Sequence, residues 1–534
     1  MSHDIHSERR FSGLVATAAV AVVSVLGTLI VAGPLDPPVG PIAPTHKTLS
    51  DVEPRVAINA TNTPGDSSSV FRITQRGSYY LTGNLAGANG KNTIEIEADE
   101  VTVDLNGFSV IGGIGSLDGV NTPVSRRGIT IRNGTIRQHG GSGIFLGATN
   151  TVRLEDLTLS DNALDGAWPG INATLARVKA VNNRDGFNLS LTVSSTLTDC
   201  TSLDNGSGFK APGNSVNFMR CIAHGNSSNG FEVSYGGRAV DCVAFSNGGV
   251  GFMALGERAI LEGCNAESNT KEGFVLTSYD NTLARCVARG NGHGSTKYSG
   301  FRTVGGGATN SVFTECVSIF NGKAGFELVA GRPSLARCEA LDNGGEGVLA
   351  PNATVDVRDS RLEANTLRGM DLGAGSVVES SAIRSNVGGG IRINGNGNAV
   401  IRRSQIISNG AIGMSVGNGS VVEDCLVATN VNQGLIGSTL SIVRRCTFDT
   451  NGTAVGNNHP NISLSGGGNL VEDNYIFNGD SGIVITSGGG SIVRRNICNA
   501  TANNYGGIVP GNRVATINTS STLASTNSND NFSY

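Results

Sequence analysis

The chain has 534 residues, of which 76 are glycine and only 14 are proline, and its formal net charge is −4. So few prolines exclude collagen, and a hydrophobic content of 38% with only 15% charged residues excludes an intrinsically disordered chain. The slightly acidic balance argues against a nucleic-acid partner, since such proteins are normally basic. The length fits either several domains or one long array of repeats.

Residues 1–33 are set apart by composition. A polar start is followed by an uncharged stretch, Phe11 to Gly33, which is long enough to cross a bilayer as a helix. The sequence is compatible with an uncleaved membrane anchor and with a cleaved signal peptide, although Pro34 disfavours cleavage after Gly33. Residues 34–69 begin with a cluster of prolines and are expected to form a spacer. We therefore expect an extracytoplasmic protein that meets the membrane only through its N-terminal segment.

The cysteines reveal a repeat that begins near Phe71. From Cys200 to Cys286 they recur every 21 or 22 residues, and in other repeats the same slot holds Ser, Asn, Leu or Val. An asparagine follows five residues after the slot, and a glycine with a large apolar residue comes shortly afterwards, as in Gly208-Phe209. A fixed period of this length is typical of a solenoid.

Each repeat also contains short runs with the alternating pattern of β-strands. Asparagine and glycine tolerate positive φ, so we expect each repeat to turn sharply at these residues. The predicted fold is all-β: one coil turn per repeat, with strands stacked in parallel ~4.8 Å apart. We expect about 19 rungs of 21–23 residues over residues 70–510, and a C-terminal cap or tail over residues 511–534.

Stacking places identical residues above one another inside the coil. The asparagines are expected to form a hydrogen-bonded ladder and the phenylalanines an internal column. The cysteine slot also accepts leucine, and in-register side chains point the same way, so we expect reduced cysteines in the core rather than disulfides.

The asparagine ladder, the rung length and the Gly-Phe step resemble right-handed parallel β-helix proteins of the pectin-lyase-like superfamily. The segments Gly77–Leu81 and Val101–Gly107 look like the first rungs of such a domain. The resemblance implies a right-handed parallel β-helix. It does not single out an activity, because the superfamily includes lyases, hydrolases, epimerases and adhesins.

Family motifs for catalysis are largely absent. Gly292-His293-Gly294 is similar to one polygalacturonase motif, but the partner carboxylate motifs are missing, so we interpret it as a loop feature. The sequence requires no cofactor and predicts no metal ligands. A Ca²⁺ site, as in pectate lyases, would need several acidic residues on one face.

The residue after each Gly-apolar step is expected to point to solvent, because strand side chains alternate. On neighbouring rungs this column juxtaposes two aromatic rings with an amide, a cation and a carboxylate. Sugars are bound by stacking on rings, with polar groups orienting the hydroxyls. The predicted substrate-binding residues are Phe145, Trp168, Asp185 and Asn188, and the predicted acid–base residues are Lys210, Glu232 and Tyr235. The alternative is ordinary surface, with both aromatics covered by N-terminal loops.

Paired charges form a second outward column. Arg402-Arg403, Arg444-Arg445 and Arg494-Arg495 alternate with Glu423-Asp424 and Glu472-Asp473 on the intervening rungs. Opposite charges one strand apart attract, so we interpret this column as a structural charge ladder rather than a basic binding patch.

The leading hypothesis is an exported β-helix protein that binds an extracellular polysaccharide and, in its stronger form, processes it as a lyase, hydrolase or epimerase. The rival hypothesis is a non-catalytic rod at the cell surface that serves in adhesion or as a spacer.

Overall fold

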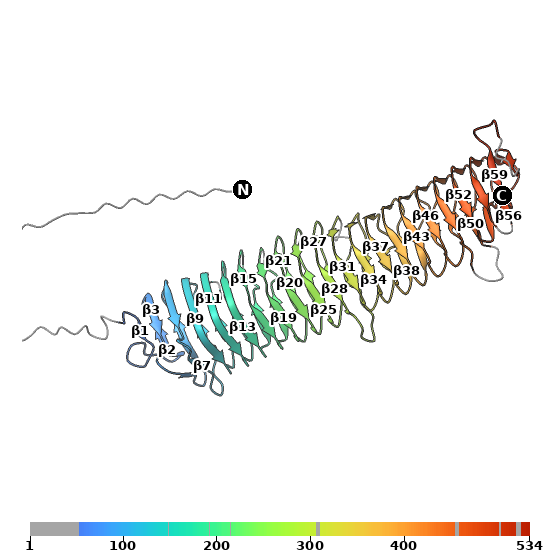
Figure 1. Ribbon diagram of the computed structural model, residues 1–534. Coiled ribbons are helices and arrows are strands. Elements are labelled where there is room, and N and C mark those ends of the chain that lie inside the picture. The colour runs from blue at the N-terminus through green and yellow to red at the C-terminus, as the bar shows by residue number, and fades with distance from the viewer. Residues whose placement is uncertain are drawn as a thin grey trace, which may run out of the picture. The chain divides into compact units, whose positions relative to one another are not determined.

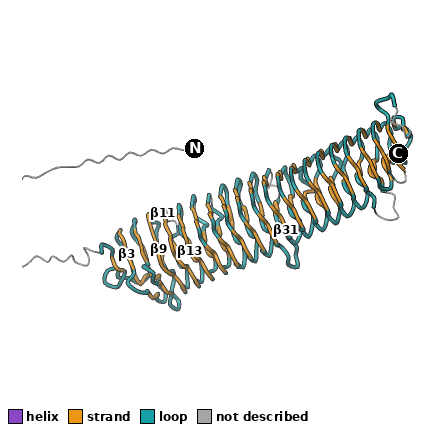
Figure 2. The backbone as a smooth tube through the Cα atoms, in the orientation of Figure 1, coloured by secondary structure: helices purple, strands orange, loops and turns teal. Residues whose placement is uncertain are grey.

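The computed structural model describes residues 53–533 except 148, 192, 214, 306–309, 454–458, 501–502 and 520–524. The chain divides into two units, Met1–Pro54 and Arg55–Tyr534. The expected signal or anchor lies outside the described residues. Within the second unit the described residues form a parallel β-solenoid without helices (Figures 1 and 2). Over the described part of the chain, no helix is long and apolar enough to span a membrane.

Each full turn of the coil contributes up to three short strands, which stack on their counterparts in the next turn and form three sheets along the coil. Sheet I contains the Gly-apolar step and has 20 strands among the described residues, in agreement with the expected number of rungs. Its strands are β2 (Ser69–Ile73), β5 (Asn92–Ile96), β8 (Val120–Asn121), β10 (Ile144–Phe145), β12 (Asp165–Trp168), β14 (Asp185–Asn188), β17 (Ser207–Lys210), β20 (Phe231–Val233), β23 (Phe252–Ala254), β26 (Phe274–Leu276), β29 (Phe301–Thr303), β32 (Phe326–Leu328), β35 (Val348–Ala350), β38 (Arg368–Leu372), β41 (Gly389–Ile393), β44 (Met414–Ser415), β47 (Leu435–Gly437), β50 (Pro460–Leu464), β53 (Ser481–Ile485) and β56 (Asn503–Tyr505).

Sheet II precedes the cysteine slot and sheet III follows it. The strands of sheet II are β1 (Val56–Ala57), β3 (Gly77–Tyr80), β6 (Val101–Asp104), β15 (Thr196–Thr198), β18 (Asn217–Met219), β21 (Arg238–Val240), β24 (Ile260–Glu262), β27 (Thr282–Ala284), β30 (Val312–Thr314), β33 (Ser334–Ala336), β36 (Asp356–Arg358), β39 (Val377–Glu379), β42 (Val400–Arg402), β45 (Val421–Glu423), β48 (Ile442–Arg444), β51 (Leu470–Glu472), β54 (Ile492–Arg494) and β57 (Arg513–Val514). The strands of sheet III are β4 (Leu85–Ala86), β7 (Ser109–Ile111), β16 (Thr201–Leu203), β19 (Ile222–His224), β22 (Val243–Phe245), β25 (Asn265–Glu267), β28 (Val287–Arg289), β31 (Val317–Ile319), β34 (Glu339–Leu341), β37 (Arg361–Glu363), β40 (Ala382–Arg384), β43 (Gln405–Ile407), β46 (Leu426–Ala428), β49 (Thr447–Asp449), β52 (Tyr475–Phe477), β55 (Ile497–Asn499), β58 (Ile517–Asn518) and β59 (Asn531–Ser533). Three longer strands run through both sheets: β9 (Arg127–Arg137), β11 (Asn150–Ser160) and β13 (Thr174–Val181).

The coil begins and ends outside the boundaries expected from the sequence. Val56 pairs with Tyr79 in the first parallel ladder, so pairing starts well before residue 70. At the other end Ile497 pairs with Phe532, which adds part of the expected tail to sheet III. Both end segments lack the regular period, and for that reason the pattern of repeats did not include them.

The turns lie beside the residues expected to make them. Positive φ falls on the residue before the cysteine slot and on the residue before the ladder asparagine, as at Asp199 (φ 54°) and Asp204 (φ 51°). The glycine of the Gly-apolar step is needed for space instead. A Cβ on Gly208 would lie 2.3 Å from the carbonyl oxygen of Gly230 on the next rung. Close approach of neighbouring rungs therefore explains this column of glycines.

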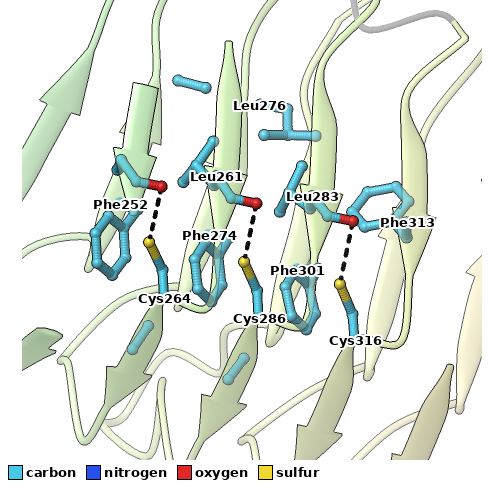
Figure 3. Close-up of a cluster of buried hydrophobic side chains, with 14 of the residues drawn as sticks. Phe252, Leu261, Cys264, Phe274, Leu276, Leu283, Cys286, Phe301, Phe313 and Cys316 are labelled. Carbon is cyan, nitrogen blue, oxygen red and sulfur yellow. Dashed lines mark hydrogen bonds between the residues drawn. The ribbon is translucent and has the colours of Figure 1, made fainter. Parts of the chain in front are cut away.

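The three internal columns predicted from the sequence are present. The Nδ2 of Asn247 lies 2.9 Å from Oδ1 of Asn269 on the next rung, and such bonds extend the ladder in both directions. Seven phenylalanine rings stack with centroids 4.6–5.1 Å apart, at Phe187, Phe209, Phe231, Phe252, Phe274, Phe301 and Phe326. All ten cysteines are buried and unpaired, and their thiols donate to main-chain carbonyls, such as Cys286 to Leu261 (Figure 3).

The charge ladder on sheet II is confirmed. Glu423 stands in register between Arg402 and Arg444, and its carboxylate lies 2.8 Å from the Arg444 guanidinium. Arg445 contacts Asp424 at 2.8 Å in the same way. Each cation on these rungs therefore has a carboxylate one strand away.

Candidate functional site

Six of the seven predicted site residues lie on strands β10 to β20 of sheet I, and Tyr235 follows β20. Strand pairing aligns Phe145 with Trp168 and Asn188 with Lys210. The pairing of Phe209 with Phe231 places Lys210 beside Glu232. We call these five outward residues, in register on five successive rungs, the stripe.

The aromatic end of the stripe is a ring pair. Phe145 and Trp168 meet edge to face, with ring centroids 5.0 Å apart and an interplanar angle of 87°. Both side chains are half-buried. The indole Nε1 of Trp168 is buried and has no hydrogen-bond partner among the described residues. The pair therefore offers an apolar surface.

Three carboxyl groups, Asp118, Asp165 and Asp185, lie three residues before the outward positions of β8, β12 and β14, and we call them the acidic row. The equivalent position before Phe145 is Ser142. Asp165 and Asp185 are directly in register. Asp165 is 1% exposed and accepts hydrogen bonds from Arg184 and from the Asn188 amide, both at 2.9 Å. The Lys210 ammonium lies 3.2 Å from Oδ2 of Asp185. The stripe and the acidic row are thus joined by direct contacts.

Burial raises the pKa of several of these carboxyl groups. It raises the pKa of Asp165 above the ordinary value for aspartic acid, and the hydrogen bonds from Asn188 and Arg184 oppose the shift. Burial likewise raises the pKa of Glu232 and of Asp118, which lies farther along the acidic row. A carboxyl with a raised pKa keeps its proton to higher pH, so it can donate a hydrogen bond or a proton.

The structure differs from the sequence expectation at three residues. Asp185 and Asn188 are each only 5% exposed, because Asp185 pairs with Lys210 and Asn188 bonds to Asp165 and Ser190. Tyr235 lies at the corner after β20 and is 43% exposed. Its hydroxyl is 3.4 Å from the Arg258 guanidinium on the next rung. Within the described residues no hydrogen bond joins its hydroxyl to Lys210 or Glu232, so the predicted acid–base trio is not joined by direct bonds.

Sequence reasoning missed Asp118 and Asp165. Asp118 is held by the Asn121 amide and by the main-chain N–H of Ser142, both at 2.7 Å. A signal for both was available, since each lies three residues before an outward residue of sheet I, as Asp185 lies before Asn188. No group of three or more His, Cys, Asp or Glu side chains suited to a metal ion occurs in the described ranges.

The arrangement can perform two kinds of chemistry. Half-buried rings beside fixed amide and carboxyl groups suit the apolar face and the hydroxyls of a sugar. Lys210 can neutralise an anionic substituent, and Glu232, with its raised pKa, can exchange a proton beside it. Along the stripe the two rings come first, then the Asn188 amide, the Lys210 ammonium and the Glu232 carboxyl group, one on each successive rung.

Comparison with known proteins identifies one family. The family described as "Right handed beta helix region" matches residues 112–259 and 333–448. No curated protein sequence matches the chain.

Solved structures with a similar coil include a mutant of the periplasmic alginate epimerase AlgG, at 11% identity over 58% of this chain and 81% of that one, with a TM-score of 0.33. The A-module of an Azotobacter vinelandii mannuronan C-5 epimerase shares 13% identity over 81% and 91% of the two chains, with a TM-score of 0.23. The Dettilon tailspike protein shares 10% identity over 68% and 59%, also with a TM-score of 0.23. Likenesses this distant say nothing about activity.

Proposed function

We propose that this right-handed parallel β-helix repeat protein binds an extracellular polysaccharide along the stripe. The observation that carries this proposal is the half-buried Phe145–Trp168 pair, which continues in register into Asn188, Lys210 and Glu232. A sugar chain laid along the coil meets rings at one end and polar groups at the other.

Binding can be tested by retention of the purified protein in gels that contain polysaccharides of different charge. Trp168→Ala removes the larger ring and should weaken retention at least about tenfold, the effect of losing one well-packed aromatic contact. Tyr475→Ala is the matched control, because Tyr475 is 51% exposed on sheet III, away from the stripe. Equal retention of the wild type and Trp168→Ala on every polysaccharide would refute binding at the stripe.

A second candidate function is processing of the bound chain. It is favoured by the position of Glu232, a carboxyl with a raised pKa one strand from the Lys210 ammonium. On this hypothesis Glu232 exchanges a proton with the sugar while Lys210 stabilises negative charge. New reducing ends or the ultraviolet absorbance of unsaturated uronates should appear with the wild type and not with Glu232→Gln. If neither signal appears with any polysaccharide that the protein retains, processing is refuted and the protein only binds. A non-catalytic rod would behave in this way.

The proposal places the protein outside the cytoplasm. It rests on the uncharged segment Phe11 to Gly33. Cell fractionation and N-terminal sequencing of the mature chain distinguish the anchor from the cleaved signal, and recovery of an intact chain in the cytoplasm would contradict both.

A further inference from the structure

One rung of the coil is longer than its neighbours, and its extra residues form a loop beside sheet I. Eight residues lie between Asn291 and Gly300, against three between the equivalent Asn269 and Gly273. The loop protrudes from the coil beside β31 (Figure 2). It carries the Gly292-His293-Gly294 sequence, which has no role in the stripe.

The loop is closed on itself and tied to the following rung. The main-chain N–H of Tyr298 lies 3.3 Å from the Gly292 carbonyl, and the N–H of Lys323 lies 2.9 Å from the Tyr298 carbonyl. His293 Nε2 lies 2.5 Å from the carbonyl oxygen of Phe320. These bonds hold the loop against the next corner of the coil.

Phe320 is an exception in its column. The residue before the ladder asparagine has positive φ and is small or polar on the neighbouring rungs, where it is Ser246, Ser268, Gly290 and Asp342. At this position Phe320 has a φ of 55° and is 50% exposed. It is the only aromatic residue with positive φ in the described part of the chain. A bulky exposed ring in this conformation is unfavourable for folding, which points to a use outside folding.

A cavity of about 330 Å³ opens at this ring. Its lining includes His293, Lys297, Phe320 and Asp342. The Lys297 stem packs beside Gly322, where a Cβ would lie 3.3 Å from Lys297 Cδ. Neither the Lys297 ammonium nor the Asp342 carboxylate has a hydrogen bond or ion pair with another described side chain. The cavity thus combines an apolar face with a cation and an anion that are not committed elsewhere.

We propose that this cavity binds a sugar unit bearing a carboxylate. The apolar face of the ring stacks on Phe320, the carboxylate pairs with Lys297, and the hydroxyls donate to Asp342. The volume is within the range of small-ligand sites. This second site does not require the stripe to bind, although an acidic polysaccharide could contact both because the loop flanks the sheet I surface.

The test uses saturation-transfer NMR with sodium glucuronate as the probe and glucose as its neutral counterpart. Trp168→Ala provides the background, so that signals from the stripe are weakened. Glucuronate should receive saturation from this variant, and adding Phe320→Ser should reduce the signal at least about fivefold through loss of the stacking surface. Serine occupies the equivalent position at Ser246 and Ser268, so the fold should persist.

Two further variants make the test specific. Lys297→Gln should remove the preference for glucuronate over glucose while leaving a weak common signal. Phe245→Ser removes another exposed phenylalanine, 37% exposed on sheet III, and should change nothing. A glucuronate signal that survives Phe320→Ser, or no signal with the Trp168→Ala background, overturns the proposal. If the stripe does not bind polysaccharide, the single variant Trp168→Ala should be retained as well as the wild type, and this result is independent of the glucuronate signal.

Discussion

Two polar columns run along this coil and differ in how their charges are compensated. On the charge ladder of sheet II, from Glu379 to Arg495, successive rungs alternate in sign, and the guanidinium groups meet carboxylates. On the stripe and its acidic row, four carboxyl groups accompany a single cation, Lys210, and Arg184 from the adjoining corner adds a second. Burial raises the pKa of Asp118, Asp165 and Glu232. A stacked fold can balance its surface charges by simple alternation. Where it does not, the imbalance is a reason to look for a ligand.

The largest predicted effect concerns the core beneath each column. Phe231 precedes Glu232 on β20 and points into the core, where it stacks between Phe209 and Phe252 with centroids at 4.6 and 4.8 Å. Phe231→Ala should lower the free energy of unfolding by about 3–5 kcal/mol, because it leaves a cavity and interrupts the stack. Denaturant unfolding measures the loss.

The matched variant is Ile401→Ala, beneath the ladder residue Arg402. Ile401 is fully buried, and its truncation should cost about 2–5 kcal/mol. Phe231→Ala should also weaken polysaccharide retention, whereas Ile401→Ala should not. Equal retention by the two variants would contradict the assignment of binding to the stripe.

The next effect is a pH dependence that arises at the N-terminal rungs. His139 is 1% exposed, and burial of its imidazole lowers its pKa to about 4. Because the unfolded chain binds this proton more readily, stability should fall as the pH drops from about 6.5 towards 4, by up to about 3 kcal/mol.

His139→Asn isolates this contribution. The main-chain N–H of His139 already bonds to Oδ1 of Asn162, so an asparagine here would extend the ladder by one rung. Thermal unfolding of the variant should change less between pH 6.5 and 5 than that of the wild type. Parallel pH profiles of the two proteins would show that His139 is not responsible.

The smallest effect compares single carboxyl groups from the two columns. The Arg444 guanidinium lowers the pKa of Glu423, so the ionised form stabilises the fold above the ordinary pKa, and this is lost as the pH falls. Glu423→Gln should cost about 0.5–1 kcal/mol at pH 7. The pKa of Asp165 is raised, so its protonated form is the one that stabilises the fold. This contribution to stability is lost as the pH rises.

Asp165→Asn should therefore leave stability unchanged or raise it by up to about 1 kcal/mol at pH 7. The difference in stability between the wild type and each of these two variants should become smaller at acid pH, where the carboxyl groups are protonated. If Asp165→Asn destabilised the fold as much as Glu423→Gln, the carboxylate charges of the two columns would be equally well compensated, which would contradict the comparison.

Features that repeat were predictable, and features confined to one rung were not. The period predicts the asparagine ladder, the phenylalanine column, the reduced cysteines and the alternating charges. Each of these features recurs at the same position of many rungs, so the sequence contains many examples of it. The period also places Trp168 next to Phe145. It cannot show that Asn188 turns to Asp165 and Ser190, or that Tyr235 faces Arg258, since these contacts depend on the path of individual corners.

The asparagine ladder also makes the coil electrically polar along its length. From Asn162 to Asn451 each side-chain amide donates to the amide oxygen of the next rung, except at Asn205, where Ser202 Oγ relays the bond to Asn226, so the amide dipoles point in one direction. Aligned dipoles add, as they do in a helix. The acceptor end of this column faces His139, at the rungs that carry the stripe, and the donor end points towards the C-terminal rungs. The two ends of the coil therefore present opposite partial charges from within the core.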